Sequence, residues 1–259
     1  MQGFSFRPAD RLNINLLYSN YSGSYTSLHG NGPAGNSSGT DQYGILGNFT
    51  FEAAKFLFIS AGSDMRYYPW LRYRCSAPSI AKRHEIRIKY LPSQKLAFEI
   101  LYDYRLSMAD NPDENKIPSQ NDIITQSVKW SVRYSPSEYL TLNTRVDYKI
   151  VKPLESKGML LLQDVNLRFR KFPVSFWMRY AIFKTGSFES CLYTWENDLL
   201  NSFSIPSLYG TGNRAYIMSS WKISNKAEFR IKYGVTATTV TNLRMKEAKE
   251  VKFQLRVIF

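Results

Sequence analysis

Few residues of this chain have the type and spacing that catalysis or metal binding requires. The two histidines are His29, in a glycine-rich stretch, and His84, and neither belongs to a recognisable pattern with a nucleophile and an orienting group. One polar stretch contains four carboxylates, Asp110, Asp113, Glu114 and Asp122. Their spacing does not match the calcium loop of an EF-hand. We therefore predict a protein that is not an enzyme and that carries no metal and no cofactor.

The chain has two cysteines, Cys75 and Cys191, which are too few for a disulfide framework or a zinc site. Both lie in expected connections on the same side of the fold, so they either form a disulfide or stay free, and the sequence leaves both alternatives open. Residues 67–74 (YYPWLRYR) combine aromatic and basic side chains that could stack sugars or bases. An aromatic belt at a membrane interface is the simpler interpretation.

Basic side chains outnumber acidic ones, which gives a net charge of +13 and a pI near 9.6. Many of them alternate with apolar residues, so on an extended strand they share the polar face. If the apolar face meets lipid, the polar face lines an interior that conducts or binds anions such as phosphates, nucleic acid or acidic glycans. Alternatively, its cations pair with Glu99, Asp103, Asp147 and Asp164 in a plugged interior. The basic candidates for this interior face are Arg87, Lys89, Lys129, Arg133, Arg145, Lys149, Arg168, Arg170, Arg179, Arg230, Lys232, Lys252 and Arg256.

Apolar and polar residues alternate with a period of two over runs of about 10–13 residues, which is the length a tilted membrane strand needs. Residues 140–150 are one such run. No apolar run reaches the roughly 18–20 residues of a membrane-spanning helix. A soluble β-sandwich or a lipocalin-like barrel would also alternate, but its strands are usually only about 5–6 residues long. We therefore predict one domain, 1–259, that forms an antiparallel up-and-down transmembrane β-barrel with about 12–14 strands in this chain.

Short and long connections alternate along the chain. Tight turns with Pro, Ser or Asn are expected at 7–12, 91–96, 135–140, 172–173 and 224–227. Longer polar connections are expected at 21–41, 66–82, 108–122, 153–158, 187–211 and 240–248. This alternation is typical of a barrel with short periplasmic turns and long outer loops. It predicts that 187–211 lies wholly on the outer side, as a hairpin that rises above the membrane.

The two ends of the chain carry further information. The last strand has Val251, Phe253, Leu255, Val257 and Phe259 on one face. This stripe resembles the closing strand of bacterial outer-membrane barrels, which implies that Phe253, Leu255, Val257 and Phe259 are read by the barrel assembly machinery. The N-terminal residues show no basic region followed by an apolar stretch, so no signal peptide is visible. We expect the chain to be the C-terminal part of a longer protein whose barrel starts upstream.

Four stretches resemble a family of long Bacteroidota outer-membrane proteins in which a helix-hairpin-helix segment precedes a β-barrel. They are 67–74 (YYPWLRYR), 195–206 (WENDLLNSFSIP), 210–216 (GTGNRAY) and 229–234 (FRIKYG). The resemblance covers the barrel part, and the helix-hairpin-helix, which binds DNA in related competence proteins, is absent from this chain.

The resemblance and the basic polar face together predict an integral protein of the Gram-negative outer membrane. We expect it to act as a conduit or transport-related component, linked to DNA or anion handling. The alternative is a structural or adhesive scaffold, or a subunit of a larger outer-membrane complex with a plugged interior. The expected partners are outer-membrane lipid, the assembly machinery and other outer-membrane or periplasmic subunits, with nucleic acid left open.

Overall fold

The fold is all-β, and the computed structural model describes residues 1–25, 41–110, 119–240 and 244–258. Alternating side chains and turn residues produce long strands joined in sequence, as the sequence predicted. The strands are β1 (Gln2–Ala9), β2 (Leu12–Tyr21), β3 (Gln42–Ala54), β4 (Leu57–Tyr68), β5 (Ser79–Ser93), β6 (Leu96–Asp110), β7 (Gln120–Ser137), β8 (Leu140–Lys152), β9 (Ser156–Arg168), β10 (Val174–Thr185), β11 (Leu192–Tyr193), β12 (Ser207–Leu208), β13 (Thr211–Lys222), β14 (Ala227–Val240) and β15 (Arg244–Val257).

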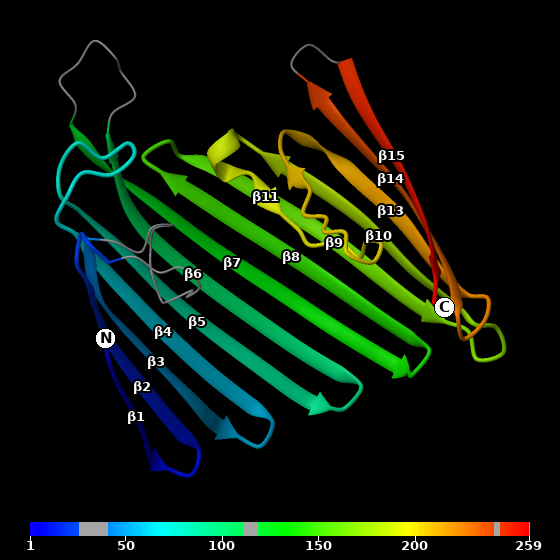
Figure 1. The fold of residues 1–259 in the computed structure, drawn as a ribbon, viewed down its shortest axis with the longest axis horizontal. Coiled ribbons are helices and arrows are strands. Elements are labelled where there is room, and N and C mark those ends of the chain that lie inside the picture. Colours follow the sequence, from blue (N-terminus) through cyan, green and yellow to red (C-terminus); the bar gives the residue numbers. More distant parts are fainter. Residues whose placement is uncertain (26–40, 111–118, 241–243, 259) are drawn as a thin grey trace. The chain divides into compact units, whose positions relative to one another are not determined.

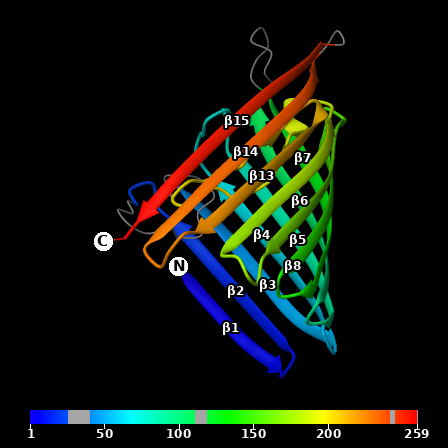
Figure 2. The same cartoon turned by 90° about the vertical axis from the view of Figure 1, so that its right-hand side faces the viewer.

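Thirteen of these strands form one sheet in chain order, β1 to β10 followed by β13, β14 and β15 (Figure 1). The paired strands run antiparallel, so each strand runs back along the one before it. Figure 2 shows β13, β14 and β15 side by side at the C-terminal end of this order. The predicted up-and-down arrangement and the predicted number of strands are therefore confirmed for the part of the chain that the structure describes.

Contacts divide the chain into two compact units. The first comprises Met1–Tyr90, Ile100–Val128 and Val151–Glu155, and so holds β1 to β4 with parts of β5 to β8. The second comprises Leu91–Glu99, Lys129–Ile150 and Ser156–Phe259, and holds the rest of those strands together with β9 to β15. Each interaction described below joins residues of the same unit.

The predicted tight turns are confirmed, since each falls between two consecutive strands of the sheet. The predicted connection at 240–248 is too long, because β14 continues to Val240 and β15 begins at Arg244. The register pairs Thr238 with Lys246 and Val240 with Arg244. Backbone pairing of two adjacent strands does not require an apolar face, so the ladder continues past the point where the apolar stripe ends.

Helical structure is minimal in the described residues. It consists of a single 3-10 turn, Phe188–Ser190, and none of it is a long apolar helix that could cross a membrane. The turn belongs to the connection between β10 and β13, where the structure departs most from the sequence prediction.

Candidate functional site

In several strands of the second unit, charged side chains are buried while their apolar neighbours are exposed. In β10, β13 and β14, Arg179, Arg214 and Lys232 are buried, and Lys232 is 0% exposed. Their outward neighbours Tyr180 and Ile217 are 51% and 42% exposed. A soluble sheet shows the opposite polarity. This inverted pattern is the one expected where the apolar face of the sheet meets lipid and the polar face lies inside.

The polar face is covered by the connection between β10 and β13, residues 186–210, which we call the inward segment (Figure 1). Inside it, β11 pairs with β12. Leu192 and Leu208 of this pair are buried in one hydrophobic cluster with Leu160, Leu162, Ala181 and Phe183 of β9 and β10. The sequence prediction that this connection lies wholly on the outer side as a raised hairpin is therefore wrong. The four leucines, the alanine and the phenylalanine of this cluster become buried because the segment folds inward.

Close backbone approach fixes the start of the inward segment. Gly158 of β9 lies so near the segment that a Cβ atom at this position would overlap the carbonyl oxygen of Ser190. Beside it, the Ser156 hydroxyl donates to the Ser190 hydroxyl at 2.8 Å and accepts from the Ser187 hydroxyl at 2.7 Å. A glycine is required in this strand because no other residue leaves room for the neighbouring chain.

Three carboxylates and three cations, which we call the Glu196 network, hold the middle of the segment. Glu196 is 0% exposed and accepts two hydrogen bonds from Arg214, at 2.6 and 2.8 Å. Lys232 donates to the same carboxylate at 3.1 Å. Arg214 also donates to Glu250 at 2.7 Å, and Lys252 donates to Asp198 at 2.8 Å. A buried carboxylate is tolerated when its partners are charged and well aligned, as they are here.

Backbone groups of the segment are anchored as well. Arg179 of β10 donates to the Trp195 carbonyl at 2.7 Å while also donating to Asp164 at 2.8 Å. The Gln254 side chain of β15 accepts from the Leu200 amide at 2.8 Å and donates to the Leu200 carbonyl at 3.1 Å. The segment is thus bound to strands β10, β13, β14 and β15, and it sits across the polar face of the unit.

The positive charges of the strands keep the carboxylates of Glu196 and Asp198 ionised. Burial opposes the ionisation of Glu196, but the hydrogen bonds and positive charges of Arg214 and Lys232 outweigh it and lower the pKa of this carboxyl. Burial likewise opposes the ionisation of Asp198, and the hydrogen bond from Lys252 outweighs it, so the pKa of Asp198 is also lowered. Because these carboxylates are paired with cations of the strands, the arrangement holds the segment across the polar face.

The basic residues that the sequence singled out fall into two groups. Arg145 pairs with Asp147, Arg87 with Glu85 at 3.1 Å, and Arg230 with Glu228 at 2.8 Å. Lys232 belongs to the Glu196 network, and Lys149 donates to the carbonyl of Glu189 at 2.6 Å and to that of Cys191 at 3.2 Å. A second group forms no ion pair with any residue that the structure describes, and it consists of Lys89, Lys129, Arg133, Arg168, Arg170 and Arg256.

The acidic partners of the network were missed by sequence reasoning. Glu196 and Asp198 lie in an irregular connection, where alternation carries no information about which way a side chain points. One signal was available: Glu196 and Asp198 stand close together in a connection between strands whose polar faces carry an excess of cations. Of the acids expected to pair with the interior cations, Asp103 accepts from Arg83 and Arg105, and Asp164 accepts from Arg179.

Both thiols are free and buried in the structure, and since Cys75 and Cys191 belong to different units, their pairing stays a prediction. Cys75 donates to the Met108 carbonyl at 2.9 Å, and Cys191 donates to the Leu208 carbonyl at 3.4 Å. The C-terminal stripe is exposed, with Phe253 at 75%. Some predicted residues lie outside the described part of the chain, namely His29, Asp113, Glu114 and Phe259. The described residues contain no cluster of His, Cys, Asp and Glu that could hold a metal.

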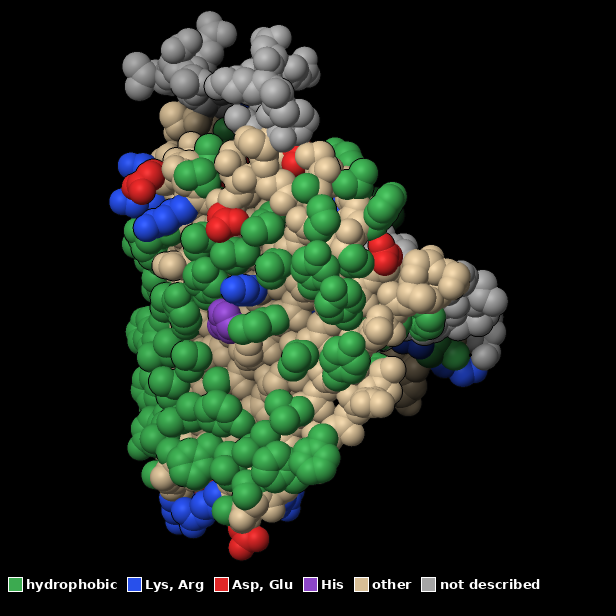
Figure 3. Space-filling model, turned by 90° about the vertical axis from the view of Figure 1, so that its left-hand side faces the viewer, with side chains coloured by type: hydrophobic (Ala, Val, Ile, Leu, Met, Phe, Trp, Pro, Cys, Tyr) green, Lys and Arg blue, Asp and Glu red, His purple; other side chains and the backbone are tan. Residues whose placement is uncertain are grey.

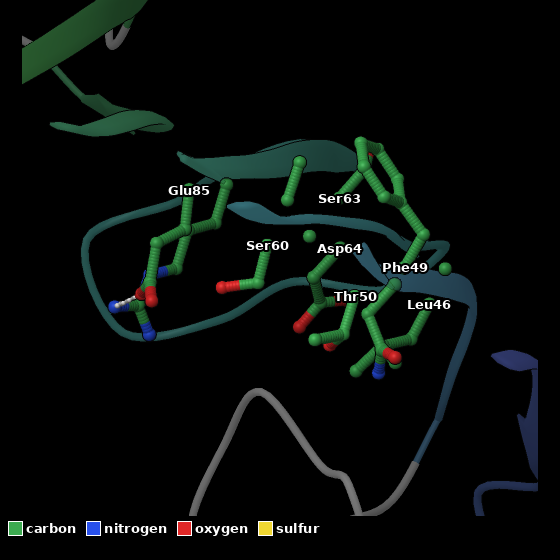
Figure 4. A pocket seen from close by; sticks show the side chains of 12 residues that line it. Leu46, Phe49, Thr50, Ser60, Ser63, Asp64 and Glu85 are labelled. Carbon is green, nitrogen blue, oxygen red and sulfur yellow. Dashed lines mark hydrogen bonds and ion pairs between the residues drawn. The ribbon is translucent and has the colours of Figure 1, made fainter. Parts of the chain in front are cut away.

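The polar face of the first unit also carries ion pairs. Asp103 is buried between Arg83 and Arg105, and Arg66 donates to Asp64 at 2.7 Å. A recess of about 330 Å³ with both polar and apolar walls opens beside them in β3, β4 and β5. Figure 4 shows Thr50, Ser60, Asp64 and Glu85 around this recess.

No family model and no curated protein matches the chain. Solved structures do match it. A chain of the RagAB peptide importer in its closed-closed state is 10% identical, with a TM-score of 0.58, and the match covers 99% of this chain. The chain spans 44% of the length of that importer chain. The outer-membrane expressed OmpT of Vibrio cholerae matches over 96% of this chain and 77% of its own, at 10% identity and a TM-score of 0.46. The KdgM porin in complex with oligogalacturonate matches over 85% and 94%, at 10% identity and a TM-score of 0.31.

At such low identity the likeness to the importer chain shows the fold alone. The chain has the fold of outer-membrane β-barrel proteins, with antiparallel up-and-down strands. Because this chain spans less than half of the importer chain, the likeness does not show what the whole protein does.

Proposed function

We propose that the protein is an integral transport barrel of the Gram-negative outer membrane, in which the inward segment narrows the polar interior. The observation that carries this proposal is the Glu196 network, because it binds a segment of the chain across the face that a solute would pass. Glu196, Arg214 and Lys232 are buried and matched in charge. The fold shared with a peptide importer chain supports a role in transport.

The solute that this interior favours is an anion. Lys129, Arg133, Arg168 and Arg256 belong to the second unit and lie on its polar strand faces without an ion pair to the described residues. Uncompensated cations raise the local concentration of anions and lower the barrier to their passage. DNA is one polyanion of this class, and a role in DNA handling within the helix-hairpin-helix family of Bacteroidota barrels is the narrower form of the proposal.

Conductance in planar bilayers tests the proposal. The wild-type protein is expected to give small, anion-selective currents under a KCl gradient. The double variant Glu196→Gln/Asp198→Asn removes both segment carboxylates of the network and is expected to increase the conductance, because the segment is released from Lys232 and Lys252. A cation preference, or no current from either protein, contradicts the proposal. The variant Glu247→Gln serves as the control, since this carboxylate is exposed and its ion pair among the described residues is with the exposed Lys249.

A scaffold with a plugged interior is the second candidate. The network favours this candidate in one respect, because each of its charged groups has an ion-pair partner among the described residues and these pairs hold the segment in place. In this case the protein works as a subunit with other outer-membrane or periplasmic proteins and catalyses no reaction. Purification from native membranes with stoichiometric partners, together with no current even after release of the segment, is the result that selects this candidate. In both cases the C-terminal stripe Phe253, Leu255, Val257 and Phe259 is proposed to engage the assembly machinery.

A further inference from the structure

The outward apolar face of the first unit contains a recess that breaks its cover of bulky side chains. Figure 3 shows this region as an area of small side chains and backbone within a largely hydrophobic surface. The recess measures about 660 Å³ and lies across β2, β3, β4 and β5. Its walls are mostly apolar and include Leu16, Gly47, Phe49, Ala61, His84 and Ile86.

The strand register explains why the recess forms. Gly47 lies opposite Leu16 and Ser63, so two successive positions of one cross-strand row have little or no side chain. In the next row Ala61 stands between Phe49 and Ile86. A methyl group flanked by larger side chains leaves a hollow, because neighbouring strands hold their side chains about 5 Å apart and cannot close it.

Two nitrogen-bearing side chains lie on this apolar face: His84 lines the recess, and Lys82 lies one cross-strand row beyond it. His84 lies opposite Ser63 and its ring stacks on Tyr104, with 5.6 Å between the ring centroids. Lys82 lies two residues before His84 on the same face of β5, opposite Met65, which is 45% exposed. Among the described residues neither Lys82 nor His84 has an ion pair or hydrogen bond. A cation facing lipid without a partner is costly, which makes such residues candidates for a binding site.

Aromatic residues fix the depth of this site. Tyr43 and Tyr67 are paired across β3 and β4 with their ring centroids 5.1 Å apart, one row beyond Met65 and Lys82. Tyrosines of barrels gather at the membrane interface. Lys82 therefore lies just below the headgroups and can extend its ammonium group to them, while the recess lies deeper, among the acyl chains. This end of β4 and β5 carries the connection expected on the outer side.

We propose that the recess binds an acyl chain of a phosphorylated glycolipid of the outer leaflet, with the lipid phosphate on Lys82 and a polar oxygen of the chain on His84. The inference rests on the outer-membrane placement proposed above. The charge of Lys82 selects an anionic headgroup, and the apolar walls below it accept the chain. In the part of the chain that the structure describes, β2, β3 and β4 carry no cation on this outward face, so Lys82 is the residue that determines preference for phosphate.

Native mass spectrometry of the detergent-solubilised protein tests this assignment, with bisphosphorylated lipid A, phosphatidylglycerol and phosphatidylcholine as probes. The wild type is expected to retain lipid A in preference to phosphatidylcholine. Lys82→Gln is expected to weaken lipid A binding about fivefold, which is the effect of one charge near a lipid phosphate. Ala61→Phe fills the recess and is expected to weaken binding roughly tenfold or more.

Matched controls come from the second unit. Lys184 is an outward lysine near the end of β10, opposite the exposed Met159, and Ala215 is an outward alanine of β13 opposite Tyr180. Lys184→Gln and Ala215→Phe are expected to leave lipid A binding within about twofold of the wild type. Heat-modifiable migration on gels verifies that each variant is folded.

Three results overturn the assignment: equal loss in the controls, equal binding of phosphatidylcholine, or no effect of Lys82→Gln and Ala61→Phe. Tighter binding of phosphatidylglycerol than of lipid A also contradicts it, because the site is then an inner-leaflet or general anionic site. A protein that binds lipid A at this recess but conducts no ions refutes the transport proposal and leaves this inference standing.

Discussion

Loss of the Glu196 carboxylate is the most informative single change to the inward segment. In Glu196→Gln the side chain keeps its size but leaves Lys232, which is 0% exposed, and Arg214 without their main counter-charge. Breaking a buried ion pair by removing one partner costs about 3–5 kcal/mol. Since about 1.4 kcal/mol is a factor of ten, the ratio of docked to released segment falls by roughly two to four powers of ten.

Hydrogen exchange measured by mass spectrometry reads this ratio directly. In the docked segment the Glu196 amide donates to the Ser204 carbonyl at 3.0 Å and the Leu200 amide donates to Gln254 at 2.8 Å. Peptides that cover 186–210 are expected to lose protection in Glu196→Gln and to keep it in the surface control Glu247→Gln. If protection in Glu196→Gln equals that of the wild type, the network does not hold the segment and the reasoning is refuted.

Three further predictions concern the same segment. Gly158→Ala is expected to destabilise docking by about 1–3 kcal/mol, because its methyl group overlaps the Ser190 carbonyl, whereas Gly62→Ala, whose Cβ would meet nothing closer than 3.8 Å, should have no effect on exchange in 186–210. Docking is expected to weaken in acid, because the pKa values of Glu196 and Asp198 are lowered in the docked state. Their contribution to the stability of docking is complete above the ordinary pKa values of about 4.3 and 3.9, and it disappears as the pH falls through the lowered pKa values. Hydrogen exchange or conductance at stepped pH will detect this loss. Burial raises the pKa of the Cys191 thiol, so maleimide should label it slowly in the wild type and faster in Glu196→Gln, and equal rates would contradict the docked position.

The strands were predictable because a period of two is a direct consequence of backbone geometry. Alternation in the sequence assigns Lys232 to a polar strand face and Phe253 to an apolar one. In the structure Lys232 is 0% exposed and Phe253 is 75% exposed. Tight turns were equally predictable, since Pro, Ser and Asn favour them locally.

The path of the inward segment was not predictable from such local signals. Its docking depends on contacts between residues far apart in sequence, such as Glu196 with Lys232 and Leu200 with Gln254. Polar connections of a barrel are expected outside, although the missing side chain of Gly158 leaves room for the Ser190 carbonyl of a packed segment. A single sequence does not identify which backbone a glycine makes room for.

The orientation of the sheet faces relative to lipid is the central claim, and quenching of a fluorescent label by nitroxide lipids measures it most directly. With the native cysteines replaced by serine, a cysteine introduced at Phe253 or at Gln254 of β15 carries the label. The label at Phe253→Cys is expected to be strongly quenched, because Phe253 points outward and is 75% exposed, and the label at Gln254→Cys is expected to be protected beside Leu200. Equal quenching at the two positions, or stronger quenching at 254, would contradict the account.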